Sequence, residues 1–185
     1  EVCEGQQLDM EFETRNDVSI EEYLEMIRLK TSVLLAAALQ MGAVVAGAEP
    51  EQLEAVYEYG LHVGLAFQLQ DDYLDAFGNP ETFGKQVGGD ILADKKTFLY
   101  LSALERADEG QRKALDGWLG QNHNAGDKVE AVRAIFLATE ADEALKNELD
   151  KHYRLAIENL EKLNVDHDSR ELFRYLAQLV GERTV

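Results

Sequence analysis

A helical periodicity that proline almost never interrupts is the feature that most constrains this chain. Apolar residues recur about every 3.6 positions through most of the sequence, and Ala, Leu, Glu and Lys fill the stretches between them. Only two prolines occur in 185 residues, so few points force a helix to stop. With 45% hydrophobic residues the chain can bury a sizeable core, and its length suits one domain. We therefore expect an all-α fold and a single domain over residues 1–185.

Local signals support several of the predicted helix starts. Ser19 with Glu22 forms a capping box, Pro50 occupies a first helical turn, and Asp168 with Glu171 opens the last helix. The predicted helices cover residues 1–13, 19–47, 50–76, 91–106, 109–120, 127–138, 140–163 and 168–182.

Two segments depart from the ordinary amphipathic pattern. Residues 33–48 are apolar nearly all round and rich in Ala and Gly, which favours a central helix that its neighbours approach closely. Residues 78–89 contain four glycines and one proline, which predicts a long loop. Loops of this length inside compact domains are often functional.

Charge and cysteine usage narrow the classes of partner. The formal net charge is −18, so nucleic acid and anionic membrane surfaces are poor partners. The single cysteine, Cys3, excludes an internal disulfide and a cysteine-rich zinc site, and we expect it to be a small buried side chain. No apolar run suits a bilayer span, so we expect no stable membrane insertion and a cytoplasmic location. The chain begins at Glu1 within a periodic stretch, so we expect a fragment of a longer protein.

Acidic side chains gather on one stripe of the helix predicted for residues 50–76. In GLAFQLQDDYLD the stripe consists of Gly64, Gln68, Asp71 or Asp72, and Asp75. Carboxylates this close repel one another unless a cation neutralises them, and all-oxygen ligation suits Mg²⁺. A solvated acidic face is the alternative interpretation. The flanking residues are largely apolar, which favours partial burial and a metal site.

A family resemblance appears at these residues. FQLQDDYLD resembles the second aspartate-rich motif of the trans-prenyl diphosphate synthases, the farnesyl and geranylgeranyl diphosphate synthase group. Upstream, GQQLD and YLEMIRLKTS resemble parts of that family's preceding two helices, and downstream GKQVGGDILADKKT is similar to its flexible loop and next helix. The four motifs follow the family's order and cover residues 5–97. The family's first aspartate-rich motif has no counterpart in these 185 residues.

The resemblance implies a fold and an activity. The fold is the isoprenoid-synthase helical bundle around a central cavity, here without its N-terminal helices. The activity is prenyl transfer, the Mg²⁺-dependent head-to-tail condensation of an allylic diphosphate with isopentenyl diphosphate, in a protein that forms homodimers. A non-catalytic regulatory subunit or diphosphate-binding protein of the same fold is the alternative. Terpene cyclases share the fold, but the lysines of the KT and GK motifs favour prenyl transfer.

The resemblance also implies roles for individual residues. Asp71 is the principal metal ligand, and Asp72 and Asp75 belong to the same carboxylate cluster. Thr31 is a cavity-wall hydroxyl near the developing cation, and Gln68 lies beside the allylic diphosphate. The remaining substrate-side residues are Gln6, Asp9, Lys30, Lys85 and Lys95, with Lys96 as the alternative to Lys95.

Other polar residues give weaker signals. Lys30 stands where a polar helix becomes apolar, so its head group is expected at an internal polar site, although a lysine that reaches solvent is the alternative. The glycines around Lys85 predict a lid that closes over substrate. The histidines show no ligand spacing, and we expect all four to be structural or exposed; they are His62, His123, His152 and His167.

Overall fold

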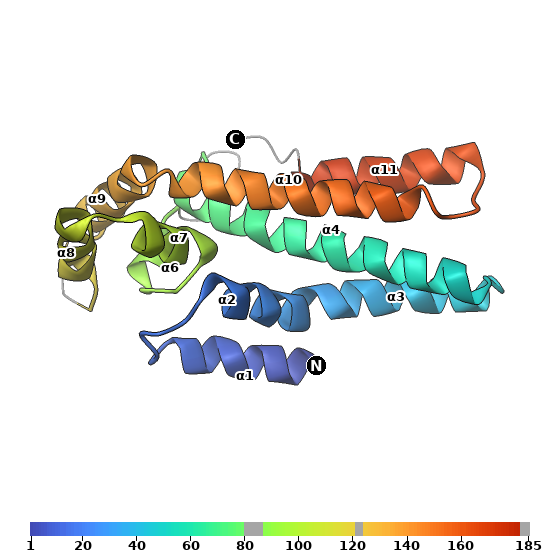
Figure 1. Cartoon of the computed structure of the whole chain (residues 1–185), viewed down its shortest axis with the longest axis horizontal. Helices are drawn as coiled ribbons and strands as arrows, with labels where there is room; N and C mark the ends of the chain where they lie inside the picture. Colours follow the sequence, from blue (N-terminus) through green and yellow to red (C-terminus); the bar gives the residue numbers. More distant parts are fainter. Residues whose placement is uncertain (80–86, 121–123, 182–185) are drawn as a thin grey trace. The chain divides into compact units, whose positions relative to one another are not determined.

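The described part of the chain is helical throughout. A computed structural model describes residues 1–79, 87–120 and 124–181, and within these ranges it contains helices and no strand, which confirms the all-α prediction (Figure 1). The helices are α1 (Val2–Phe12), α2 (Ile20–Ile27), η1 (Arg28–Ser32), α3 (Val33–Val45), α4 (Pro50–Phe77), α6 (Gly89–Leu92), α7 (Phe98–Arg106), α8 (Glu109–Trp118), α9 (Ala125–Ala138), α10 (Ala141–Leu160) and α11 (His167–Gly181).

Side-chain caps account for several helix starts. At α2, the N–H of Glu22 donates to Ser19 Oγ and the N–H of Ser19 donates to the Glu22 carboxylate, so the predicted capping box is confirmed. At α11 the capping residue was predicted two positions too late, because Asp166 rather than Asp168 accepts the hydrogen bond from the N–H of Ser169. The sequence allowed either aspartate, since both precede the apolar stripe.

Two predicted helices are divided in the structure. The predicted helix 19–47 contains a π-helical segment, η1, between α2 and α3. The predicted helix 91–106 is wrong as one element, because α6 ends at Leu92 and α7 begins at Phe98. Asp94 lies between them with φ = 53°, outside the right-handed helical region.

The chain divides into two compact units, and several helices contribute to both. The first contains residues 1–8, 24–70 and those from 148 onward. Its core joins α4, α10 and α11: the Tyr59 hydroxyl donates to the Phe173 carbonyl at 2.7 Å, and the Phe173 ring meets the Tyr59 ring edge-on. The buried members of this core are Ala55, Val56, Tyr59, Val63, Ala156, Leu160, Leu163 and Ala177. The prediction of a single domain stays a prediction.

Glycines let helices of the first unit approach η1 and α3 at backbone distance. A Cβ atom on Gly5 of α1 would lie 2.4 Å from the backbone nitrogen of Lys30. On α4, a Cβ on Gly64 would lie 2.6 Å from the Cα of Ser32, and one on Gly60 would lie 2.7 Å from the Cα of Ala36. Real side chains cannot occupy these positions without displacing backbone. The three glycines therefore fix how α1 and α4 pack on η1 and on the start of α3.

The apolar segment 33–48 is only partly a core element, which corrects the expectation from its composition. Val33 and Ala36 are buried, but Leu34 is 62% exposed and Val45 is 89% exposed. The helical stretch Ile20–Val45 also has the length and composition to cross a membrane, contrary to the sequence expectation, with 28% of its apolar window buried. Core helices of soluble proteins meet the same criterion, so this does not assign the stretch to a bilayer.

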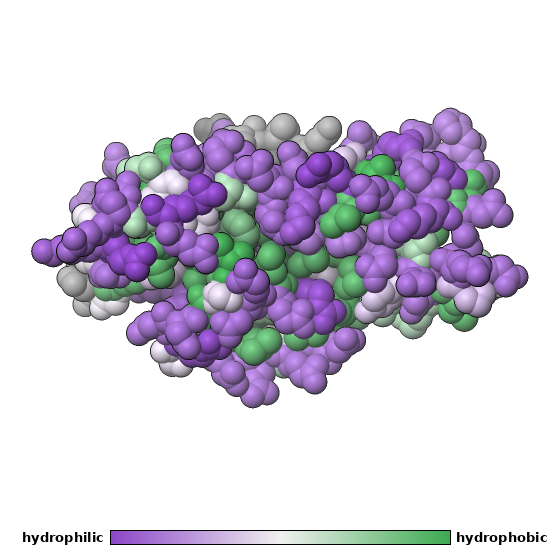
Figure 2. Space-filling model, viewed as in Figure 1, coloured by the Kyte–Doolittle hydropathy of each residue, from purple (hydrophilic) through white to green (hydrophobic). Residues whose placement is uncertain are grey.

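Polar side chains dominate the face of the molecule in Figure 2. This agrees with 36 acidic residues and a net charge of −18. Cys3 lies exposed on α1, so the expectation of a buried cysteine was wrong. The residue occupies the outward side of the first helix, which its small apolar side chain does not predict.

The second unit contains residues 9–23 and 71–147. Apolar side chains of α7, α8, α9 and α10 are buried in it, among them Leu99, Leu115, Phe136 and Leu145. The charged side chains of Asp72, Lys128 and Asp142 are buried there as well, and Lys128 of α9, which is 4% exposed, forms an ion pair with Asp94. The C-terminal part of α4 brings the aspartate stripe into this unit.

Candidate functional site

Asp72 is the most deeply buried carboxylate of the aspartate stripe. It is 4% exposed and accepts a hydrogen bond from the hydroxyl of Tyr23, a buried residue of α2. Burial raises the pKa of Tyr23 well above its ordinary value, and the Asp72 charge raises it further. The phenol therefore stays protonated and remains a donor. Asp71, one position earlier, is half-buried.

Asp75, Asp90 and Lys95 form a connected polar group beside that stripe. The backbone N–H of Asp90 donates to Asp75 Oδ1 at 2.9 Å, and Lys95 Nζ lies 2.6 Å from Asp90 Oδ1. Burial raises the pKa of Asp75, the Asp90 N–H opposes that rise, and the Asp90 charge adds to it. The hydrogen bond to Asp90 raises the pKa of Lys95, which therefore keeps its charge.

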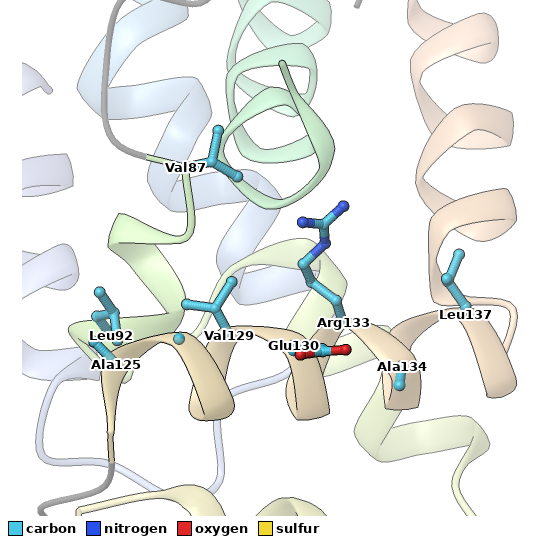
Figure 3. Close-up of a pocket in the computed structure, with 9 residues that line it drawn as sticks. Val87, Leu92, Ala125, Val129, Glu130, Arg133, Ala134 and Leu137 are labelled. Carbon is cyan, nitrogen blue, oxygen red and sulfur yellow. The ribbon is translucent and has the colours of Figure 1, made fainter. Parts of the chain in front are cut away.

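The segment that carries Asp90 rests on α9. Gly88 has φ = 86°, and a Cβ there would lie 2.6 Å from a methyl carbon of Val129. Beside this contact lies a pocket of about 610 Å³ between Val87, Leu92 and α9, with Arg133 at one side (Figure 3). Arg133 also stacks over the Phe77 ring at 5.3 Å. None of the predicted site residues that the structure describes lines this pocket.

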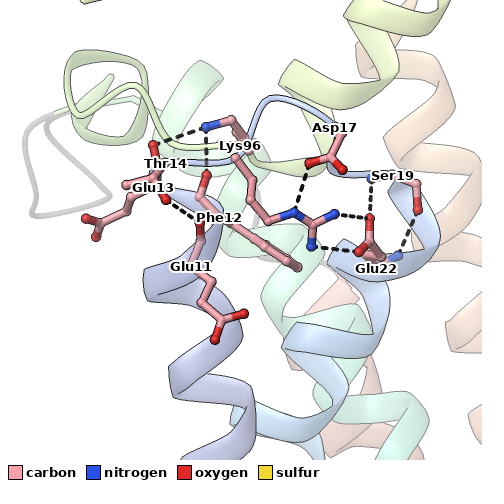
Figure 4. Close-up of polar contacts among 9 residues, drawn as sticks. Glu11, Phe12, Glu13, Thr14, Asp17, Ser19, Glu22 and Lys96 are labelled. Carbon is pink, nitrogen blue, oxygen red and sulfur yellow. Dashed lines mark hydrogen bonds and ion pairs between the residues drawn. The ribbon is translucent and has the colours of Figure 1, made fainter.

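The structure separates the two adjacent lysines. Lys96 Nζ donates to the carbonyl oxygens of Phe12 at 2.7 Å and Glu13 at 3.3 Å, at the C-terminal end of α1 (Figure 4). Unpaired carbonyls at a helix end attract a cation, so Lys96 serves as an anchor for α1. Lys95 instead pairs with Asp90, and more than half of its side chain is exposed. This placement favours Lys95 over Lys96 as the lysine available to a ligand.

Lys30 and Thr31 lie in the π-helical segment of the first unit. Thr31 Oγ1 is 3.4 Å from the side-chain oxygen of Gln68 on α4, and both side chains are half-buried. Lys30 is also half-buried, one residue from Thr31. π-Helical turns within α-helices are frequent at functional sites because they reorient side chains. The structure thus brings Thr31 and Gln68 together, and their roles stay predictions.

The structure gives less information on the positions of the remaining predicted site residues. Gln6 is exposed on α1, and Asp9 is half-buried near Lys95, whose pKa the Asp9 charge raises. Lys85 and its predicted lid lie outside the described residues. Within the ranges that the structure describes, no group of three or more His, Cys, Asp or Glu side chains is arranged to hold a metal ion. The metal roles of Asp71, Asp72 and Asp75 stay predictions.

Several contacts in or near the site were not predicted. Tyr23 and Asp90 were noted only as members of motifs, and their partners Asp72 and Asp75 are distant in sequence. His62 is half-buried and His152 is buried, and their Nδ1 atoms lie 3.0 Å apart, in agreement with a structural role. Helix spacing alone offers no signal for such long-range pairs.

Comparisons with known proteins identify the family of the chain. The polyprenyl synthetase family model matches residues 1–136. A short chain isoprenyl diphosphate synthase of Methanothermobacter thermautotrophicus is 45% identical over 187 residues, covering 98% of this chain and 55% of the relative.

Solved structures of prenyl diphosphate synthases also match this chain, and they confirm the predicted fold class. A geranylgeranyl pyrophosphate synthase matches with a TM-score of 0.92 and 44% identity, over 100% of this chain and 57% of its own. A geranylgeranyl pyrophosphate synthase from Corynebacterium glutamicum, crystallised with isoprenyl diphosphate and magnesium, matches with a TM-score of 0.91 and 30% identity, over 99% of this chain and 52% of its own. The chain thus spans about half the length of these proteins.

Proposed function

The chain belongs to the polyprenyl synthetase family, and from this we propose that it supplies part of a prenyltransferase for isoprenoid biosynthesis. The proposed reaction joins an allylic diphosphate to isopentenyl diphosphate, head to tail. The observation that carries the proposal is the Asp75, Asp90 and Lys95 group, which sets a charged lysine beside the aspartate stripe. The non-catalytic alternative has no support among the relatives.

Lys95 is proposed to bind the diphosphate. A diphosphate leaves its allylic carbon only if the growing negative charge is neutralised. Asp90 raises the pKa of Lys95 and holds its ammonium group at 2.6 Å, so the charge is present before substrate arrives. A diphosphate competes with Asp90 for this ammonium group. Lys30 and the predicted Lys85 are proposed as the other two diphosphate lysines.

The aspartates are proposed to hold a divalent cation, and magnesium is the proposed ion. Their donor set is all oxygen, which suits Mg²⁺, and a cation would offset the desolvation that raises the pKa of Asp75. When bound, the ion neutralises charge on the leaving diphosphate. We assign Asp71 as principal ligand, with Asp75 and Asp72 in support. The Tyr23 hydroxyl holds the Asp72 carboxylate in place.

Thr31 and Gln68 are proposed to face the organic part of the substrate. Their side-chain oxygens lie 3.4 Å apart, so the amide carbonyl and the hydroxyl share one polar spot next to Lys30. An oxygen dipole directed at a developing carbocation stabilises it without forming a bond. Gln6 and Asp9 are proposed as substrate-side residues of α1.

Oligomeric state and location are further proposals. We propose a homodimer, which the exposed apolar side chains of α3 and α11 support because such surfaces favour association. We propose a cytoplasmic location, which the presence of a single, exposed cysteine supports.

The proposed role of Asp71 is tested by Asp71→Ala in the protein that carries this chain. Losing a metal ligand should lower turnover by about 100-fold, because the interaction strengthens as the leaving group departs. Folding should be unharmed, since one of three neighbouring negative charges is removed. Product formation from both diphosphates with Mg²⁺ and the thermal unfolding midpoint are measured together. Asp150→Ala, an exposed aspartate of α10, is the matched control. A steep fall in the unfolding midpoint with unchanged turnover would reverse the assignment.

A further inference from the structure

Asp94 adopts a backbone conformation that most residues other than glycine avoid. Its φ of 53° lies in the left-handed region, which L residues other than Asn and Asp rarely enter. The residue stands between α6 and Lys95, at the place where the sequence predicted an unbroken helix. A conformation of this kind persists only where surrounding contacts hold it.

Both carboxylate oxygens of Asp94 have partners. Lys128 Nζ lies 2.6 Å from Asp94 Oδ1, and the backbone N–H of Gly120 donates to Oδ2 at 3.0 Å. Lys128 is 4% exposed, so its charge is removed from water and depends on this pairing. It also sits near the N-terminus of α9, where the helix dipole disfavours a cation. Helix stability therefore does not explain a lysine at this position.

From Asp94 an unbroken series of contacts leads to the aspartate stripe. The N–H of Asp94 donates to the Ile91 carbonyl, and the N–H of Lys95 donates to the Asp90 carbonyl at 3.0 Å. Lys95 Nζ pairs with the Asp90 side chain, and the Asp90 N–H donates to Asp75. The turn at Asp94 thus determines where the Lys95 side chain begins and which way it points.

The neighbouring residue of α9 secures the other end of the same segment. Val129 packs against Gly88, whose φ is also positive. Residues 128 and 129 therefore hold the segment 88–94 at its two left-handed positions. Both contacts come from the same helical turn of α9. This turn therefore supports the segment that carries Asp90 and Lys95.

We propose that Lys128 is a positioning residue that, through its ion pair with Asp94, fixes the turn presenting Lys95 to the diphosphate. The diphosphate part of this statement rests on the proposed function, whereas the ordering of residues 88–95 does not. Lys128 contacts no substrate in this role. It acts through the backbone of Asp94 and the side chain of Lys95.

Amide hydrogen exchange on the 185-residue chain tests the ordering directly. Lys128→Met should speed exchange of the amides of Asp90 and Lys95 by about tenfold, because the hydrogen bonds of this turn open more often. Exchange in α7 should be unchanged, and Lys113→Met, an exposed lysine of α8, should leave both segments unchanged. Unaltered exchange at Asp90 and Lys95 in Lys128→Met would overturn the proposal.

A second variant guards against loss of folding in the first. In Asp94→Gly/Lys128→Met the glycine enters the left-handed region without strain and no unpaired charge is buried. This variant should fold and still exchange several-fold faster than the unaltered chain at residues 90 and 95, because no side chain ties the turn to α9. Exchange equal to that of the unaltered chain would contradict the proposal.

Inorganic diphosphate with Mg²⁺, measured by calorimetry, tests the link to Lys95. Lys128→Met should weaken binding by about tenfold when Lys95 is present and cause no further loss in a Lys95→Met background. Equal losses of diphosphate affinity in both backgrounds would contradict the proposed coupling between Lys128 and Lys95. If the unaltered chain binds no diphosphate, the proposed function fails for this chain, and the exchange experiment still decides the role of Lys128.

Discussion

The His62 and His152 pair joins α4 to α10 inside the first unit. The Nδ1 atoms are 3.0 Å apart, so one ring donates and the other accepts, and this requires the accepting nitrogen to be unprotonated. Burial lowers the pKa of His62 to about 4, and the charges of His152 and Lys151 act in the same direction. Two carboxylates face the pair: Glu58 lies 4.0 Å from His62 and Glu148 lies 3.2 Å from His152.

This pair predicts a loss of stability in mild acid. In the unfolded chain His62 takes up a proton near pH 6.5, but in the folded chain only near pH 4. Between these values the unfolded state binds more protons, so the free energy of unfolding should fall by about 2 kcal/mol from pH 7 to pH 5. His62→Gln should flatten that slope in urea titrations. His167→Gln, at an exposed position, should leave it unchanged, and an equal slope in all three proteins would refute the assignment.

Glu148 acts in a different pH window. Its hydrogen bond to His152 lowers the pKa of Glu148 to about 2, despite partial burial. A carboxylate with a depressed pKa contributes stability above about pH 4.5, and that contribution is lost as the pH falls toward 2. The interval between pH 7 and pH 5 therefore isolates His62 from Glu148.

At the scale of single residues, the sequence predicts which side chains could bind a ligand better than it predicts which side chains contact one another. The helical stripe of Asp71, Asp72 and Asp75 follows from spacing alone, because a single helix determines it. The Tyr23 partner of Asp72 is 49 positions away, and Lys128 is 34 positions from Asp94. Such contacts depend on how separate helices pack, which the periodicity of any one helix does not encode.

The contact of α4 with η1 gives a prediction at the scale of elements. Gly64→Ala should lower the free energy of unfolding by about 2 kcal/mol, because the new Cβ would lie 2.6 Å from the Cα of Ser32 and backbone must move. Gly42→Ala on α3 is the matched control, since nothing lies within 4 Å of its Cβ position. That change should raise stability by about 0.5 kcal/mol through helix propensity. Denaturant unfolding measures the free energy of unfolding of both variants. Equal changes in the two would show that the close approach of α4 to η1 does not affect stability.

The two divided helices show why the sequence pattern did not predict these helix boundaries. Between Leu92 and Phe98 there is no glycine or proline, so the periodic pattern continues through a region that is not helical. The break occurs at Asp94, which Lys128 and Gly120 hold in the left-handed region. The π-helical segment likewise leaves no composition signal. Gly5 and Gly64, which pack against this segment, can be read from the sequence, but the backbone that they contact cannot.

At the scale of the whole molecule, two opposing features govern association. The net charge of −18 makes copies of the chain repel one another. Apolar side chains nevertheless lie exposed along α3 and α11, and exposed apolar surface favours association. On α3 they are Leu34, Leu35, Met41, Val44 and Val45, and on α11 they are Leu172, Tyr175, Leu176 and Leu179. The sequence analysis assigned the α3 side chains to the interior, because a segment that is apolar on all sides does not show which of its side chains will face outward.

Salt should therefore increase self-association of the 185-residue chain. Repulsion between exposed charges is screened over about 10 Å at 0.1 M salt and about 3 Å at 1 M, whereas apolar attraction is not weakened. The weight-average mass from sedimentation equilibrium should rise as NaCl is raised over that range. Leu34→Glu/Met41→Glu adds charge to the exposed face of α3 and should abolish the rise. Leu137→Glu alters an exposed leucine of α9 and should behave like the unaltered chain. If mass instead falls as salt is added, ion pairs rather than the α3 face hold the copies together, and the homodimer proposal loses this support.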